Sequence, residues 1–308
     1  MTEIPVHCIA ILGPTCSSKS EVAMRIAGTL DGEIVSCDSM QVYRGLDIGT
    51  AKPSVAERQR IPHHLVDILD LQQPWDANRF VLAAEPLLAE IASRRRPAIL
   101  VGGTGLYARA LIYGFSLQPS NPEVFAQVCR EYESGGETAL KQELLAAGGA
   151  LHPDILKNWR RLVRAVEILR LTGLPPRSSK EDAPRPGFQQ FILLPSLDLL
   201  RQRIRHRTAA MLAQGWIEET RQLLAAGLEQ APTARQALGY PEIAAYLRSG
   251  GTDRQALLEQ LVLRTVQYAR RQRTWFRHQH PGATLLEFDH EAAIATLPEQ
   301  ILEKAVGY

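Results

Sequence analysis

Short runs of consecutive apolar residues recur along the chain, separated by segments with helical periodicity. The runs are rich in Ile, Val and Leu, a pattern typical of parallel strands that are covered on both faces. They lie at residues 6–12, 33–37, 97–101, 191–194 and 285–288. In the two intervals between the first three runs, apolar positions recur every three or four residues at 19–30 and 78–93, which predicts amphipathic helices. This alternation predicts an α/β fold with a parallel sheet core flanked by helices.

The strand signals stop between residues 115 and 187. Helical patterns occupy 122–133, 137–147 and 155–172, and a polar, proline-rich stretch follows at 175–186. We therefore predict a helical insertion domain at 115–187, set into a core formed by residues 1–114 and 188–308. Further helices are expected at 197–214, 254–278 and 292–304.

The first strand leads into a loop with candidate chemistry. Residues 10–20 read AILGPTCSSKS, so a strand breaks at Gly13 and a helix starts at Lys19. This geometry aims backbone N–H groups and a helix N-terminus at an anion, while Lys19 supplies a charge and Ser20 a hydroxyl for Mg²⁺. Ser18 replaces the second glycine of the usual P-loop pattern G-x-x-x-x-G-K-[ST]. A positive φ at Ser18 would cost about 1–2 kcal/mol. An ordinary strand–turn–helix is the alternative, and we favour the P-loop.

Two more loops are expected to meet the P-loop at the carboxyl edge of the sheet. Asp38 ends the second strand, where ligands bind in open parallel sheets, although a turn Asp is the alternative. The following stretch, 39–53, has neither strand nor helix periodicity and reads as a long ordered loop. The third strand ends in Gly102-Gly103-Thr104-Gly105 rather than in the acidic residue that a P-loop ATPase requires.

Charge is unevenly distributed, although the net charge is only +2. Residues 1–150 hold 13 basic and 17 acidic side chains, and residues 151–308 hold 22 and 16. The helix at 254–278 mixes arginines with aromatic residues, which suits nucleic-acid backbone and base stacking. A solvated helix face is the alternative for the basic run at 160–164. The positive second half is compatible with a polyanionic partner.

Composition places further bounds on the protein. The 308 residues are 45% hydrophobic and 22% charged, an ordinary globular profile. No apolar run reaches the roughly 18 residues of a membrane span, and residues 1–7 do not resemble a signal peptide. The four cysteines form no C-x-x-C pair, so we expect a reduced, cytoplasmic protein without a zinc site. No long exposed apolar stripe demands a partner, and a monomer is expected.

The ordered series of motifs resembles the tRNA dimethylallyltransferase (tRNA isopentenyltransferase) family in its bacterial form, over nearly the whole chain. The motifs that carry the resemblance are Gly13-Pro14-Thr15 with Lys19-Ser20, Asp38-Ser39-Met40-Gln41, Asp47-Ile48-Gly49-Thr50-Ala51-Lys52-Pro53, Gly102-Gly103-Thr104-Gly105, Arg161 with Arg164, Arg203 with Arg207, Leu238-Gly239-Tyr240, and Tyr268-Ala269-Arg270-Arg271-Gln272.

The resemblance implies transfer of a dimethylallyl group from dimethylallyl diphosphate to the exocyclic amine of the adenosine 3′ of the anticodon in tRNA, with Mg²⁺ as cofactor. It implies catalytic roles for Asp38, Lys19, Thr104 and Arg207, and a metal contact from Ser20. Diphosphate would be bound by Gly13, Pro14, Thr15, Cys16, Ser17, Ser18, Lys19 and Ser20. The anticodon stem-loop of tRNA would be bound by Asp38, Ser39, Met40, Gln41, Thr104, Arg160, Arg161, Leu162, Val163, Arg164, Gln236, Gly239, Tyr240, Arg271 and Arg277.

The sequence departs from the family pattern at three positions and leaves three rival functions open. Ser18 replaces the loop glycine, Phe125 lies where the family often has an Arg, and Pro241 where Lys is common. The rivals are a prenyltransferase acting on free AMP, ADP or ATP, a P-loop nucleotide kinase, and a non-catalytic RNA-binding protein. The free-nucleotide enzyme would have little need of the helical insertion.

Overall fold

A computed structural model of the chain describes residues 8–114, 118–149, 155, 158–176 and 183–306. By their contacts, the residues divide into two compact units. The first comprises Met1–Gly114 and Asp182–Tyr308, and the second is Phe115–Glu181. Residues 183–187 belong to the first unit, although the sequence analysis assigned them to the insertion. The Arg185 N–H donates to the Ile112 carbonyl, and the Arg185 guanidinium pairs with Glu85 at 2.5 Å, which fixes this stretch to the core.

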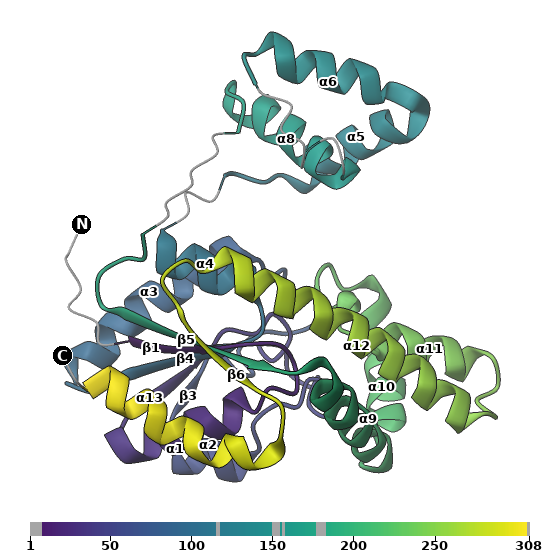
Figure 1. The fold of residues 1–308 in the computed structure, drawn as a ribbon. Coiled ribbons are helices and arrows are strands. Elements are labelled where there is room, and N and C mark those ends of the chain that lie inside the picture. Colours follow the sequence, from purple (N-terminus) through teal and green to yellow (C-terminus); the bar gives the residue numbers. More distant parts are fainter. Residues whose placement is uncertain (1–7, 115–117, 150–154, 156–157, 177–182, 307–308) are drawn as a thin grey trace. The chain divides into compact units, whose positions relative to one another are not determined.

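The first unit is built on a six-stranded parallel sheet with the order β3-β2-β4-β1-β5-β6 (Figure 1). Its strands are β1 (Cys8–Leu12), β2 (Glu33–Ser36), β3 (His63–His64), β4 (Ala98–Gly102), β5 (Phe188–Pro195) and β6 (Thr284–Phe288). The α/β prediction is thus confirmed, and all five expected strands are present; residues 6–7 of the first lie outside the described residues. The two-residue edge strand β3 was not predicted, because only two of its residues pair with β2.

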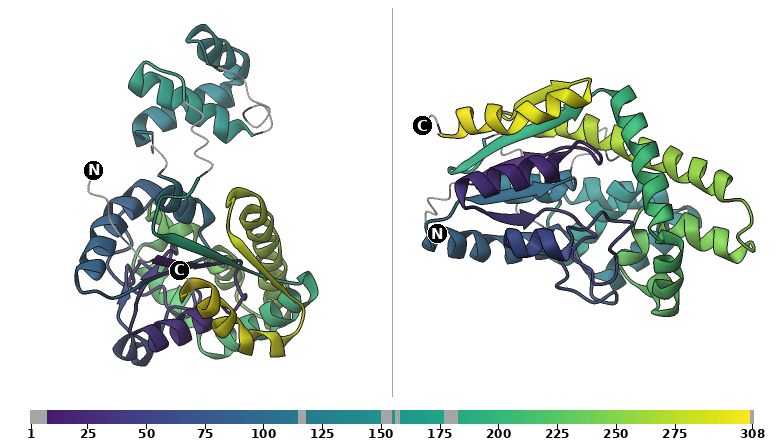
Figure 2. Two further views of the ribbon diagram at one scale, coloured as in Figure 1. Left: turned by 60° about the vertical axis from the view of Figure 1, so that its left-hand side comes forward. Right: turned by 90° about the horizontal axis from the view of Figure 1, so that it is seen from below.

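Helices cover both faces of the sheet (Figure 2). The helices of the first unit are α1 (Lys19–Leu30), α2 (Val55–Arg60), α3 (Ala77–Ser93), α4 (Gly105–Tyr113), α9 (Leu197–Ala213), α10 (Trp216–Ala225), α11 (Tyr240–Arg248), α12 (Arg254–Gln279) and α13 (Leu297–Val306). On one face, α1 and α13 bury apolar side chains against Ile11, Ile99 and Leu193 of the sheet. Helices α3 and α12 contact strands β4 and β5, and α4 packs against both of these helices. The strands therefore read as continuous apolar runs because they are covered on both sides.

The second unit is a small helical body with its own core. It contains α5 (Pro122–Glu131), a kink at Tyr132–Gly136 where Gly135 has a φ of 90°, α6 (Glu137–Ala146) and α8 (Trp159–Thr172). Side chains of α5, α6 and α8, among them Val128, Leu140 and Leu162, form that core. Helix α8 starts later than predicted, since Asn158 caps its first turn, while residues 156–157 lie outside the described residues. Six residues of the predicted proline-rich stretch, 177–182, also lie outside them.

In the described part of the chain, no helix has both the length and the apolar character that a membrane crossing needs.

Candidate active site

The loop between β1 and α1, called the P-loop below after its sequence pattern, joins a strand to the start of a helix at Lys19 and is conformationally strained. A Cβ on Gly13 would lie 2.6 Å from the Leu193 carbonyl oxygen, so only glycine fits there. Cys16 and Ser18 both have φ of 62°, in the left-handed region. The strained alternative considered for Ser18 is therefore the one observed, with a cost of about 1–2 kcal/mol. A loop that stores this strain must be held by its surroundings.

Two arginines on α9 hold the loop from outside. Arg203 donates to Ser18 Oγ at 2.5 Å and to Glu291 at 2.9 Å. Arg207, one helical turn later, donates to Thr15 Oγ1. The i+4 spacing read from the sequence places both guanidinium groups at the P-loop, as expected for a pair of groups on one helix face.

Lys19 is the first residue of α1 and is half-buried. Its ammonium donates to the Pro14 carbonyl at 3.2 Å. Burial, together with the nearby charge of Arg207, lowers the pKa of Lys19 from 10.5 to about 8, against the opposing influence of Asp38. Two cations near one loop repel each other and attract an anion, so this edge of the sheet is electrostatically prepared for a diphosphate or a similar group.

Gln272 of α12 joins the P-loop to the second glycine loop. Its Oε1 accepts from the Thr15 N–H at 2.9 Å, and its Nε2 donates to the Gly103 carbonyl at 2.8 Å. A Cβ on Gly103 would lie 2.6 Å from Nε2, which explains the glycine. The Thr15 N–H is thus used within the protein and is not directed at an anion. Gln272 was part of a quoted motif, but no role was predicted for it.

Asp38 lies at the carboxyl end of β2, as predicted, and is held by its own turn. Its Oδ1 accepts from the N–H groups of Met40 at 2.8 Å and Gln41 at 3.3 Å. Among the described residues, none donates a hydrogen bond to Oδ2. Thr104 acts from the neighbouring loop, where its Oγ1 accepts from the Ser39 N–H at 3.1 Å. Asp38 therefore has both the turn role considered as the alternative and, among the described residues, a second carboxylate oxygen without a donor.

One cavity of about 500 Å³ brings the predicted groups together. Its wall includes Lys19 and Ser20 of the P-loop, Asp38 and Arg207. The loop after Asp38 contributes Ser39, Met40, Gln41 and residues Gly49 to Pro53. Apolar wall residues include Met24, Val101 and Met211. The second glycine loop lines it through Gly102 and Gly103, whereas the Thr104 hydroxyl is bonded to Ser39.

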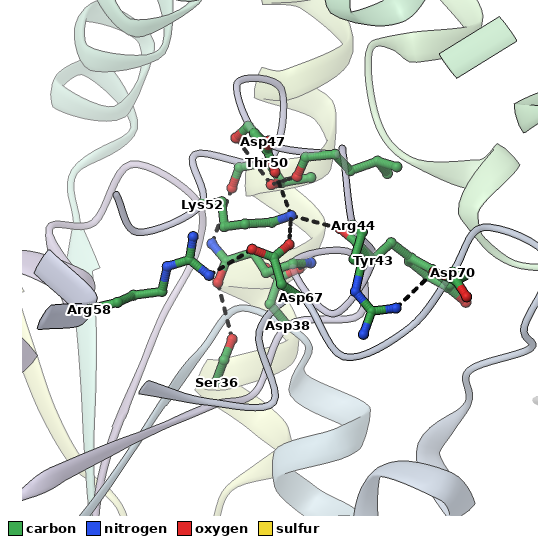
Figure 3. A network of polar contacts seen from close by, with 12 residues as sticks. Ser36, Asp38, Tyr43, Arg44, Asp47, Thr50, Lys52, Arg58, Asp67 and Asp70 are labelled. Carbon is green, nitrogen blue, oxygen red and sulfur yellow. Dashed lines mark hydrogen bonds and ion pairs between the residues drawn. The ribbon is translucent and has the colours of Figure 1, made fainter. Parts of the chain in front are cut away.

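The long loop 39–53 is ordered by a buried lysine. The Lys52 side chain is 2% exposed, and its ammonium donates to the Tyr43 carbonyl at 2.6 Å, Asp47 at 2.6 Å and Asp67 at 2.5 Å (Figure 3). Asp67 also accepts from Arg58 at 2.6 Å. The sequence predicted an ordered loop here, but not this network, because the loop has no regular periodicity from which the partners of Lys52 could be read.

Five of the predicted RNA-binding side chains fall into three groups. Gln236 and Arg271 line the cavity, with the Arg271 guanidinium 5.9 Å from the Tyr268 ring centre. Arg160 and Arg161 are exposed at the start of α8, and Arg160 lies 5.3 Å from the Trp159 ring. Arg277 lies at the far end of α12, where it pairs with Glu287.

Four of the side chains predicted to contact RNA are buried or engaged within the protein. Leu162 and Val163 are buried in the core of the second unit, so their side chains are not available to RNA. Arg164 pairs with the fully buried Glu167 and donates to the Gln118 carbonyl, a structural role. Tyr240 is 1% exposed and donates to Glu219 at 2.7 Å.

The three departures from the family pattern have local explanations or consequences. Pro241 lies in the first turn of α11, where a missing N–H is tolerated. Gly239 precedes it with φ of 90°, and a Cβ there would lie 2.3 Å from Trp216. Phe125 packs against the core of the second unit. Ser18 is the departure that carries strain.

The donor set around Ser20 suits a metal ion only in combination with an anion. The described residues contain no group of three or more His, Cys, Asp or Glu side chains that could hold a metal. The exposed hydroxyl of Ser20 and the carboxylate of Asp38 line the same cavity. Mg²⁺ is commonly held by one or two protein oxygens plus substrate phosphates and water, and these residues fit that arrangement.

Fold and site together define a class of protein: a parallel α/β protein in which the loop after β1, with Lys19, shares a cavity with the Asp38 carboxylate at the end of β2. A family model described as IPP transferase matches residues 41–279, and one described as isopentenyl transferase matches residues 6–73. The chain belongs to the IPP transferase family.

Relatives and solved structures resemble the chain over most of its length. A tRNA dimethylallyltransferase of Thermus thermophilus is 42% identical over 283 residues, covering 92% of this chain and 91% of the relative. One of Halorhodospira halophila is 42% identical over 290 residues, covering 90% and 91%. The crystal structure of the full-length tRNA isopentenylpyrophosphate transferase of Bacillus halodurans is 35% identical, with a TM-score of 0.69 and 97% of each chain covered. A eukaryotic dimethylallyltransferase, solved acting on tRNA, is 25% identical, with a TM-score of 0.78 and 96% of this chain covered against 77% of its own.

Proposed function

We propose that the protein transfers the dimethylallyl group of dimethylallyl diphosphate to the exocyclic amine of the adenosine 3′ of the anticodon in tRNA. The observation that carries this proposal is the shared cavity, which has the cationic P-loop with Lys19 in one wall and the Asp38 carboxylate in another. A diphosphate leaving group also accounts for Gly102 at the end of β4, where an ATPase would need an acidic residue.

The P-loop side stabilises the leaving group. In the transfer, the allylic C–O bond breaks, its electron pair leaves with diphosphate, and a C–N bond forms to the adenosine amine. Negative charge grows on the diphosphate as this bond breaks. Lys19 and Arg207 line the cavity beside this loop and would stabilise that charge. Preorganised charges of this kind usually make the largest contribution to catalysis.

Asp38 acts on the amine. The exocyclic amine of adenine needs no full deprotonation before it attacks, so an ordinary carboxylate suffices as proton acceptor. Oδ1 is held by Met40 and Gln41, which leaves Oδ2 to accept the proton or to orient the N–H group.

The adenosine must leave its stack to reach Asp38, at a cost of a few kcal/mol. Gln236 and Arg271 line the cavity, where they would contact the nucleotide that enters. Arg160 and Arg161 of the second unit are exposed and suited to backbone phosphates, which position the RNA without reading its sequence.

Mg²⁺ fits this site when the diphosphate supplies most of its ligands. Ser20 would provide a protein oxygen, and Asp38 lies in the same cavity. The bound ion would supply charge neutralisation for the leaving diphosphate.

Labelled dimethylallyl diphosphate tests the proposal against its rivals. We expect label in unmodified tRNA and none in AMP. Label in AMP alone would indicate the free-nucleotide enzyme, and phosphate transfer from ATP without a prenyl product would indicate a kinase. Asp38→Ala is expected to lose about 10²–10⁴-fold in rate while still binding tRNA. Turnover that survives this change would contradict the role of Asp38, and the absence of turnover in the unmodified protein would favour a non-catalytic RNA-binding protein.

A further inference from the structure

The loop 39–53 forms one wall of the cavity, yet it has little regular structure of its own. Its single strand-like contact is the isolated bridge between Tyr43 and Leu69. Val42, Tyr43 and Leu46 are fully buried, so the loop is fastened at its middle. The part that returns to the cavity, from Gly49 to Pro53, needs a separate support.

Glu219 provides that support from α10. Its Oε2 accepts from the N–H groups of Asp47 at 3.2 Å and Ile48 at 2.7 Å. Its Oε1 accepts from the Gly49 N–H at 3.2 Å and from the Tyr240 hydroxyl at 2.7 Å. Four donors thus use the full acceptor capacity of one carboxylate. Three consecutive backbone N–H groups that converge on one anion cannot be served equally well by a neutral amide.

The packing around Glu219 fixes the distance between loop and helix. Trp216, one turn earlier on α10, lies against Gly49, where a Cβ would be 2.1 Å from the indole nitrogen. The same indole packs edge-on against the Tyr240 ring, with centroids 5.8 Å apart. Burial, reinforced by the charge of Glu219, raises the pKa of Tyr240 well above its usual range, so this phenol stays a donor.

A chain of hydrogen bonds leads from Glu219 to Asp38. Directly after Gly49, the carbonyls of Thr50 and Ala51 each accept from Gln41 Nε2 at 3.2 Å. The Gln41 N–H donates to Asp38 Oδ1. The position of the residues beside Gly49 therefore determines where Gln41 lies, and with it the turn that orients Asp38.

Gln41 is also fixed from the sheet. Its Oε1 accepts from the Ser36 hydroxyl at 3.0 Å. The side-chain amide of Gln41 is thus held between Ser36 at the end of β2 and the loop residues Thr50 and Ala51. A shift of either segment moves this amide.

We propose that Glu219 is a positioning residue for prenyl transfer: its charge holds the returning part of the loop and, through Gln41, orients Asp38. This inference rests on the proposed function. Lys52 supports the loop from inside, independently of Glu219, so loss of the Glu219 charge should displace the cavity wall without unfolding the loop.

Glu219→Gln tests the proposal, with Glu218→Gln as the matched control. Glu218 is the preceding residue on α10, is largely exposed and pairs with Arg221 on the surface. In Glu219→Gln, an NH₂ group replaces one oxygen and faces backbone N–H donors. We expect the single-turnover rate at saturating tRNA to fall about 10- to 100-fold, as a misplacement of the reacting groups would cause. The affinity of Glu219→Gln for inorganic diphosphate, measured by calorimetry, should stay close to that of the unmodified protein. The control Glu218→Gln should match the unmodified protein in both the single-turnover rate and the diphosphate affinity.

Three further experiments separate positioning from general destabilisation. Hydrogen exchange should accelerate at the amides of Asp47, Ile48 and Gly49, while the strands stay protected. Glu219→Asp keeps the charge and should recover part of the rate. In a double-mutant cycle, Gln41→Ala should cost less in the Glu219→Gln background than alone, since the two residues act in series.

The proposal is overturned if Glu219→Gln transfers the prenyl group as fast as Glu218→Gln. It is also overturned if rate, diphosphate affinity and protection of the strands fall together, which would mark Glu219 as a purely structural residue. Failure of the proposed function gives a different result: the unmodified protein would transfer no prenyl group. In that case, unchanged hydrogen exchange at residues 47–49 in Glu219→Gln would also overturn the role of Glu219 in holding the loop. Faster hydrogen exchange there would support that role.

Discussion

Gln272 accepts a hydrogen bond from the Thr15 N–H at 2.9 Å and donates one to Gly103 at 2.8 Å, so a single side chain of α12 joins both glycine loops of the cavity. The amide is suited to this bridge because it offers one acceptor and one donor and carries no charge. A residue with either function alone would leave one loop unsupported.

Gln272→Glu is therefore expected to weaken diphosphate binding. The carboxylate keeps the acceptor for Thr15, loses the donor for Gly103 and adds negative charge beside the P-loop. At the effective dielectric constant of a buried site, this repulsion should lower the affinity by a factor on the order of 10–100. Calorimetric titration with inorganic diphosphate measures it, and Gln267→Glu, on the exposed side of the same helix, is the control. Equal affinities for the two variants would refute the bridging role.

The left-handed backbone at Ser18 predicts a difference between two substitutions that both remove its hydroxyl. Ser18→Ala and Ser18→Gly each lose the hydrogen bond from Arg203, but only glycine relieves the φ of 62°. The relief of about 1–2 kcal/mol is partly offset by the greater chain entropy of glycine, about 0.5–1 kcal/mol. Ser18→Gly should be the more stable variant by roughly 0.5–1 kcal/mol in urea unfolding. If alanine is tolerated as well as glycine, the loop is not strained in solution.

Arg207 and Arg205 offer a comparison on one helix. Arg207 donates to Thr15 and lines the cavity, whereas Arg205 pairs with Glu259 on the surface. Removing a preorganised charge next to the leaving group costs about 10²–10³-fold in rate, while an exposed ion pair contributes at most about 1 kcal/mol to stability. Arg207→Ala should lose prenyl transfer to that extent, and Arg205→Ala should retain it. Single-turnover kinetics with labelled substrate decide between these outcomes.

The sequence predicts the parts of this site that follow from local pattern. The strand before Gly13 and the helix after Lys19 are visible as changes of apolar periodicity. Their position at one edge of the sheet follows from the parallel topology, as does that of Asp38. The five longer strands were found for the same reason.

The remaining contacts depend on side chains that meet only in the folded chain. Gln272 lies 257 positions from Thr15, and Glu219 lies 170 positions from Gly49. In α8, the basic run drew attention to 160–164 as a unit, but helical periodicity places Leu162 and Val163 inward. Periodicity could have excluded these two residues from the predicted RNA contacts.

The lowered pKa of Lys19 predicts that diphosphate binding depends on pH in the weakly alkaline range. In the free protein, burial and the charge of Arg207 bring the Lys19 pKa down to about 8. A bound diphosphate favours the protonated ammonium and raises this pKa. Below pH 8 the ammonium is already protonated in the free protein, so affinity does not change through Lys19. As the pH rises above 8, the free protein loses its proton first, and binding must then take one up.

Affinity should consequently fall up to tenfold per pH unit between about pH 8 and the higher pKa of the complex, since one proton is linked to binding. Calorimetry at pH 8.5 in two buffers of different ionisation enthalpy measures the proton uptake directly. Lys19→Arg is the reference, because a guanidinium stays protonated throughout this range. The ratio of the two proteins' affinities cancels the protonation of diphosphate itself. A ratio that stays constant from pH 7.5 to 9.5 would show that the ammonium of Lys19 does not titrate in this range, and that burial beside Arg207 does not govern its charge.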